Sequence, residues 1–150
     1  MKQFAMIVII GWLSLVHFSC GDKSTGPGSP AGVSFSWQSS KCIGGGSAKV
    51  SGIDSLFAYS FKDSLVIDFS VTSNCCPDSN RFSVSTIAGT DTLAVVVADT
   101  AEHLCRCICT YMIHCSFGNL PEDRYVVRCS ICSSGGCDDP IYLVNVFRKK

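Results

Sequence analysis

The sequence predicts an all-β protein: a single antiparallel β-sandwich, stapled by disulfides, that follows an N-terminal targeting segment and a flexible tether. Apolar and polar residues alternate with a period of two over several short stretches, as in strands with one buried face. Turn-forming residues separate these stretches at roughly ten-residue intervals, and no long stretch has the period of a helix. The 150 residues also include 11 cysteines, which is typical of an oxidising compartment.

The overall composition narrows the possible partners. Lysine plus arginine equals aspartate plus glutamate, with 12 of each, so no global charge attracts the chain to nucleic acid. Hydrophobic residues make up 47% of the chain, which favours a folded core over disorder. We therefore expect one ordinary domain, no nucleic-acid partner and no cofactor.

Residues 1–19 have the pattern of a signal peptide. Lys2 provides the positive start, and residues 4–16 form an apolar run interrupted only by Gly11 and Ser14. This run is too short to cross a membrane comfortably, because a spanning helix needs roughly 20 apolar residues.

The stretch Phe18-Ser19-Cys20-Gly21-Asp22 resembles the cleavage site of bacterial lipoprotein precursors, with a small residue before the cysteine and His17 where leucine is usual. The resemblance implies cleavage before Cys20 and a lipid on Cys20, which would anchor the protein to a membrane of the bacterial envelope. The alternative is secretion with Cys20 left as a thiol.

A tether and a domain follow this site. Residues 20–31 are rich in glycine, serine and proline, which predicts a flexible linker, and residues 32–150 form the cysteine-rich domain. Lipidation of Cys20 would leave ten cysteines, an even number that permits five bridges.

Alternation predicts the strands of the domain in order, and glycine, proline, asparagine or aspartate mark most of the turns between them. The expected strands are 33–38, 57–61, 65–71, 82–86, 93–98, 104–117, 125–131 and 141–147. The strands at 57–61 and 65–71 form a hairpin around 62–64, and the longest loops are 74–80 and 132–140.

The strand at 104–117 carries Cys105, Cys107 and Cys109 at alternate positions, followed by Cys115. In a strand these side chains share one face, but residues two apart lie at or beyond the limit of disulfide geometry. The three sulfurs therefore either bridge to different neighbours or converge on a metal.

Disulfides are the favoured interpretation because thiols are usually oxidised after export. The adjacent pair at 75–76 should point in opposite directions and anchor the 74–80 loop to the cysteine strand. The candidates are Cys42, Cys75, Cys76, Cys105, Cys107, Cys109, Cys115, Cys129, Cys132 and Cys137.

The alternative is a thiolate site for zinc or copper. It would combine the Cys-x-Cys-x-Cys strand with Cys129-x-x-Cys132, or with His103 or His114. The metal-ligand candidates are Cys105, Cys107, Cys109, Cys129 and Cys132.

Two further resemblances concern the domain. The stretch from Leu120 to Cys129, with Tyr125 at the start of a strand, resembles the tyrosine corner of immunoglobulin-like sandwiches, although the cysteine follows four residues after the tyrosine rather than two. The order Asn-Cys-Cys, Cys-x-Cys-x-Cys and a Leu-to-Tyr turn is similar to small cysteine-rich bacterial surface lipoproteins. These resemblances imply a fold and a location but no activity.

No catalytic motif is present. The chain has no Gly-x-Ser-x-Gly and no His-Glu-x-x-His, and Cys129-x-x-Cys132 is not followed by a helical pattern. We therefore predict a non-enzymatic binding or interaction module of the envelope, whose ligand is an envelope or extracellular protein or a glycan. Loops 74–80 and 132–140 are its expected contact surfaces, because loops on a rigid scaffold commonly carry recognition.

Overall fold

The computed structural model describes residues 32–43, 56–76, 80–102, 105–133, 136–137 and 139–150, in which all regular structure is β-strand. The predicted signal peptide, Cys20 and the tether therefore lie outside the described residues. The strands are β1 Ser34–Ser39, β2 Phe57–Phe61, β3 Leu65–Asn74, β4 Phe82–Ala88, β5 Thr92–Asp99, β6 Ile108–Gly118, β7 Arg124–Ser133, β8 Gly136–Cys137 and β9 Tyr142–Phe147. Within these ranges no helix is long and apolar enough to span a bilayer.

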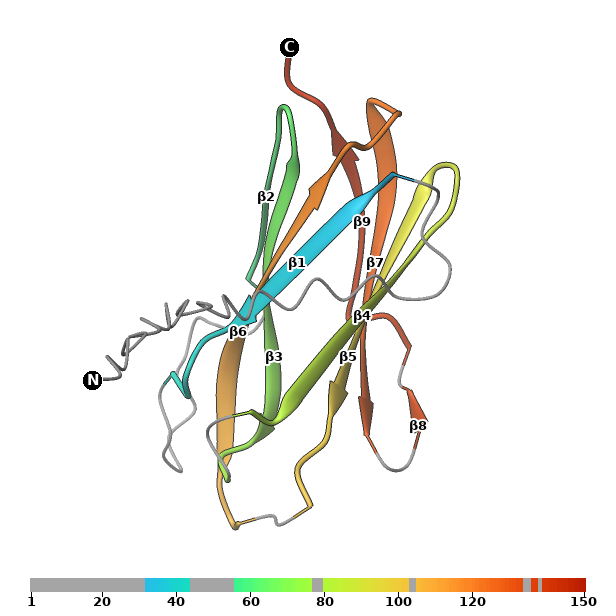
Figure 1. The fold of residues 1–150 in the computed structure, drawn as a ribbon. Helices are drawn as coiled ribbons and strands as arrows, with labels where there is room; N and C mark the ends of the chain where they lie inside the picture. Colours follow the sequence, from blue (N-terminus) through green and yellow to red (C-terminus); the bar gives the residue numbers. More distant parts are fainter. Residues whose placement is uncertain (1–31, 44–55, 77–79, 103–104, 134–135, 138) are drawn as a thin grey trace, which may run out of the picture.

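The strands form two sheets (Figure 1). The first has the order β1-β6-β3-β2, and the second has the order β4-β5-β7, with β8 and β9 both paired to β7. The predicted hairpin is confirmed, since β2 and β3 pair antiparallel around residues 62–64. The predicted loop 132–140 is in part a short hairpin, because Cys132 pairs with Cys137 of β8.

One pair of strands contradicts the antiparallel prediction. β5 and β7 run parallel, with Thr92 opposite Val126 and Ala98 opposite Cys132. The reason is the path of the chain, which leaves the second sheet after β5, contributes β6 to the first sheet and returns as β7. Parallel neighbours need such a crossover, which a period-two pattern does not reveal.

Residues from both sheets build one hydrophobic core. On β6 the predicted sharing of one face is confirmed for Cys109 and Cys115, and this face is the buried one, which also carries Tyr111, Ile113 and Phe117. Aromatic rings join the sheets: Phe82 lies 5.0 Å from Tyr111, and Phe61 lies 6.2 Å from Tyr125. Complete burial of one such aliphatic or aromatic side chain contributes roughly 1.5–3 kcal/mol.

Tyr125 lies near the start of β7, where the chain enters this strand after leaving β6. Its ring is buried, and its hydroxyl accepts a hydrogen bond of 3.2 Å from the backbone N–H of Glu122. At the same end Arg148 donates to Asp123 and to the carbonyls of Lys62, Leu120 and Glu122. This end is therefore held by polar contacts and one buried ring.

We expect Tyr125→Phe to lower the free energy of unfolding by about 1 kcal/mol, because it removes one hydrogen bond. Tyr125→Ala should cost about 3–5 kcal/mol, because it also removes the buried ring. Urea unfolding measures both, with Phe147→Leu as the half-exposed control, for which the change should stay within about 0.5 kcal/mol. Equal midpoints for all three variants would contradict the proposed corner.

Candidate functional site

The described cysteines form four disulfides: Cys42–Cys109, Cys75–Cys107, Cys76–Cys105 and Cys132–Cys137. The favoured prediction is confirmed, since the three cysteines at 105, 107 and 109 each bridge to a different partner. The adjacent Cys75 and Cys76 both bind the 105–107 segment, Cys75 through Cys107 and Cys76 through Cys105. Four disulfides are consistent with an extracytoplasmic protein.

The prediction of a cysteine strand was wrong at its start. β6 begins at Ile108, so Cys105 and Cys107 lie in the segment before the strand and only Cys109 lies on it. The physical reason is that this segment is held by disulfides and side-chain hydrogen bonds rather than by a strand ladder.

Ten cysteines would permit five bridges, but two of them are not paired. Cys115 on β6 and Cys129 on β7 are free thiols inside the core. Desolvation raises the pKa of Cys129 to about 12. It also raises the pKa of Cys115, with smaller contributions from Cys129 and Asp68. Both groups are therefore neutral, unreactive thiols at ordinary pH.

The predicted metal-ligand set does not come together. Cys109 is bonded to Cys42, Cys132 is bonded to Cys137, and Cys129 is buried in the core. Cys105 and Cys107 remain, and Cys75 and Cys76 join them in the single group of potential metal ligands found among the described residues. The Asn-Cys-Cys stretch was recognised as an anchor in the sequence, but its meeting with Cys105 and Cys107 depends on the pairing of β3 with β6.

We call these four residues, Cys75, Cys76, Cys105 and Cys107, the cysteine cluster. Their sulfur atoms all lie within 4.8 Å of one another. The sulfurs of Cys105 and Cys107 are 3.5 Å apart, and those of Cys75 and Cys105 are 4.0 Å apart. Cys76 is exposed and the others are half-buried, so solvent reaches the cluster.

Asn74, the last residue of β3, organises the backbone around the cluster. Its side-chain amide donates to the carbonyls of Cys105 and Cys107, the latter at 3.0 Å. Its side-chain oxygen accepts from the N–H groups of Cys76 and Cys105, each at 3.0 Å. One asparagine therefore joins the two segments that carry the four sulfurs.

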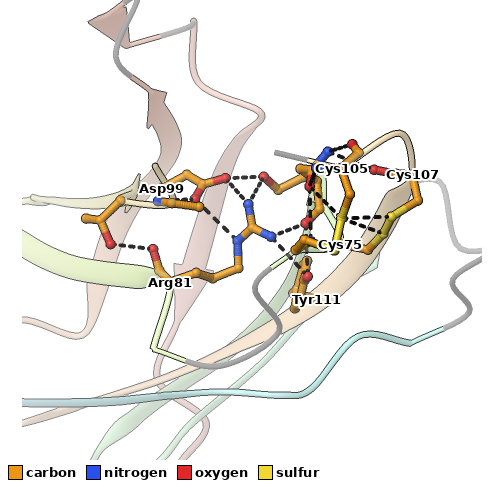
Figure 2. Close-up of polar contacts among 11 residues, drawn as sticks. Cys75, Arg81, Asp99, Cys105, Cys107 and Tyr111 are labelled. Carbon is orange, nitrogen blue, oxygen red and sulfur yellow. Dashed lines mark hydrogen bonds and ion pairs between the residues drawn. A yellow bond between two sulfur atoms is a disulfide. The ribbon is translucent and has the colours of Figure 1, made fainter. Parts of the chain in front are cut away.

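Arg81 holds Asn74 from the core side, and Figure 2 shows its guanidinium between Asp99 and Tyr111 beside Cys75. The side chain is 1% exposed and donates to the Asn74 carbonyl, to the Tyr111 hydroxyl and to the carboxylate of Asp99. Burial works to lower the pKa of Arg81, but the hydrogen bonds to Asp99 and Tyr111 outweigh it and keep the guanidinium charged.

Asp99 is the partner of this buried charge. Burial works to raise the pKa of Asp99, but hydrogen bonds from Arg81, Ser73 and the Ala101 N–H outweigh it and lower the pKa below the ordinary value of 3.8. The carboxylate therefore stays ionised well below neutral pH.

The histidines do not build a catalytic site within the described residues. His103 lies outside them, and His114 is an exposed residue whose Nδ1 lies 2.7 Å from the Asp68 carboxylate on the outer face of the first sheet. Of the predicted contact loops, residues 77–79, 134–135 and 138 also lie outside the described part of the chain.

Comparison with known proteins finds no matching family model, no matching curated protein and no matching solved structure.

We expect the free energy of unfolding to decrease as the pH falls below about 4, because protonation of Asp99 removes the partner of Arg81. The pKa of Asp99 is lowered by folding, so its stabilising effect is present above the ordinary pKa and is lost as the pH falls through the folded value. Asp99→Asn should weaken this dependence. Urea titrations at about every pH unit between pH 2 and pH 7 measure the free energy of unfolding of both proteins.

Asp123→Asn is the matched control, since Asp123 is 66% exposed and pairs with Arg148 at the opposite end. Surface pairs contribute little, so this variant should keep the wild-type pH dependence. An identical effect of the two substitutions would contradict the special role of Asp99.

Proposed function

We propose that the protein is an exported bacterial lipoprotein, with lipid on Cys20, a tether up to residue 31 and a β-sandwich that is related in architecture to immunoglobulin-like domains. The proposed sandwich is supported by the shared core and the Tyr125 corner, while the parallel β5–β7 pair gives it a topology of its own. We further propose that it is a non-enzymatic binding module of the envelope.

The observation that supports this proposal best is the position of the cysteine cluster relative to the start of the domain. Ser34 of β1 pairs with Gly118 at the end of β6, and Asn119 donates to the Gly32 carbonyl. The cluster adjoins the beginning of β6 instead. β6 has 11 residues. At roughly 3.3 Å per residue, its first and last residues are about 33 Å apart.

A domain anchored through residues 20–31 would thus have its membrane anchor at one end. The end that carries the cysteine cluster would face away from the membrane. We call this second end the clamped end, defined by the cysteine cluster, Cys42–Cys109 and the adjoining exposed residues Ile43, Arg106 and Ile108. Three disulfides join its described segments, which lowers the conformational entropy that these segments lose when a partner binds.

The exposed residues of the clamped end favour a protein over a glycan as the partner. Ile108 is 68% exposed and Ile43 is 40% exposed, and Ile43 pairs with Thr110 two residues from Ile108. Branched apolar side chains bind by burial of hydrophobic surface, whereas the polar hydroxyl-rich surface of a glycan would require polar or aromatic groups.

Lipidation predicts that Cys20→Ala removes the lipid and the membrane attachment together. Cells grown with a labelled fatty acid should label the wild-type protein in the membrane fraction, whereas the variant should lack label. Fractionation and intact mass measure both properties. Label retained on the variant would contradict lipidation at Cys20.

The contact proposal predicts that Ile108→Ser weakens binding of an envelope protein partner, which crosslinking in intact cells and mass spectrometry would identify. Leu143→Ser on β9 is the matched control, since Leu143 is 65% exposed and lies in the other sheet. Loss of the crosslink in the Ile108 variant alone supports the clamped end as the contact surface. An equal crosslink yield in both variants, or a glycan as the retained ligand, would overturn it.

A further inference from the structure

The cysteine cluster has the dimensions of a four-thiolate metal site. A tetrahedral zinc ion binds sulfur at about 2.3 Å, which places its ligand sulfurs about 3.8 Å apart. The two contacts between sulfurs of different disulfides, 3.5 Å and 4.0 Å, lie on either side of this value. The bonded sulfur pairs would separate to the same distance by rotation about the side-chain bonds once they were reduced.

The backbone that carries these sulfurs is held by contacts that do not depend on the disulfides. Asn74 joins the two segments through hydrogen bonds to Cys76, Cys105 and Cys107. The N–H of Cys75 also donates to the Cys107 carbonyl at 3.3 Å. Reduction therefore leaves a set of hydrogen bonds that keeps the four side chains directed at one point, as outer-shell contacts do in metal sites.

The ligand set selects the metal. Four sulfur donors with no carboxylate among them favour a soft or borderline ion, and tetrahedral four-sulfur coordination is typical of structural zinc. Arg106 lies between Cys105 and Cys107 in the sequence and is exposed, so it brings positive charge near a centre whose four thiolates exceed the charge of the ion.

We propose that Cys75, Cys76, Cys105 and Cys107 bind one zinc ion when both of their disulfides are reduced, so that the clamped end exists in either a disulfide form or a zinc form. This inference goes beyond the proposed binding function and does not depend on the identity of its partner.

A dithiol can reduce the disulfide form to the form that binds zinc. Each disulfide takes two electrons and two protons from one dithiol, which becomes a disulfide itself, so two dithiols yield four cysteine thiols. Zinc then binds the four thiolates and releases four protons to solvent. A newly exported chain can bind zinc without a reductant, because its cysteines are still thiols.

The experiment uses the full chain purified after export, reduced with a small dithiol and then dialysed with zinc in the absence of oxygen. We expect one zinc ion per chain. Alkylation followed by peptide mass mapping should show that zinc protects Cys75, Cys76, Cys105 and Cys107, while Cys42, Cys109, Cys132 and Cys137 are alkylated as fast as without zinc.

Two double variants provide the comparison. Cys75→Ser with Cys107→Ser should lose the zinc, whereas Cys132→Ser with Cys137→Ser removes a disulfide elsewhere and should retain it. Reduced wild-type protein that remains folded but holds no zinc would overturn the proposal. So would zinc that is held equally by both double variants, which would identify adventitious binding.

A second measurement covers the case in which the reduced chain unfolds. Stoichiometric zinc should then restore the far-ultraviolet circular dichroism of β-structure, and magnesium should not. Failure of zinc to restore this signal in the wild-type protein would overturn the proposal. If only the crosslinking experiment failed, the contact surface around Ile108 would be contradicted, whereas the zinc site would still be supported by the zinc measurements.

Discussion

The buried guanidinium of Arg81 is the constraint on which the arrangement of the clamped end depends. A charge removed from water is strongly destabilising unless its N–H groups are satisfied, and here the acceptors come from both sheets. Asp99 on β5 neutralises the charge, while Tyr111 on β6 and the carbonyl of Asn74 on β3 accept from the other side. The position of Arg81 therefore fixes how the two sheets meet at this end.

A series of hydrogen bonds runs from Arg81 outward to the cysteine cluster. Its hydrogen bond to the Asn74 carbonyl fixes the end of β3, and the Asn74 side chain then fixes the segment that precedes β6. The sulfurs lie at the outer end of this series, where solvent reaches them. The disulfides thus reinforce an arrangement that polar contacts already define, and the hydrophobic core lies behind them. Arg148 has a comparable role at the opposite end, where it also stacks 4.2 Å from the Phe61 ring centre.

Local patterns predicted the parts of the fold that depend on neighbouring residues. Alternation identified the shared face of Cys109 and Cys115 on β6 and the β2–β3 hairpin, because both are encoded within a few consecutive residues. The parallel β5–β7 pair and the roles of Arg81 and Asn74 were not predicted, since they depend on contacts between distant segments. Arg81 shows the difficulty well, because a charged residue beside a loop is usually solvated, and only the pairing of β4 with β5 brings it to Asp99.

The two classes of cysteine show how position decides chemistry. Cys115 and Cys129 have the same functional group as the cluster cysteines, yet burial raises the pKa of each thiol and leaves no route for an oxidant, a reductant or a metal. They act as small apolar core residues. The cluster sulfurs lie where solvent, electrons and ions can reach them, and where polar contacts keep them together whichever bonds they form. The solvent-accessible thiol chemistry of the described domain therefore lies in the cysteine cluster, and the buried Cys115 and Cys129 can remain unchanged while the cluster changes its state.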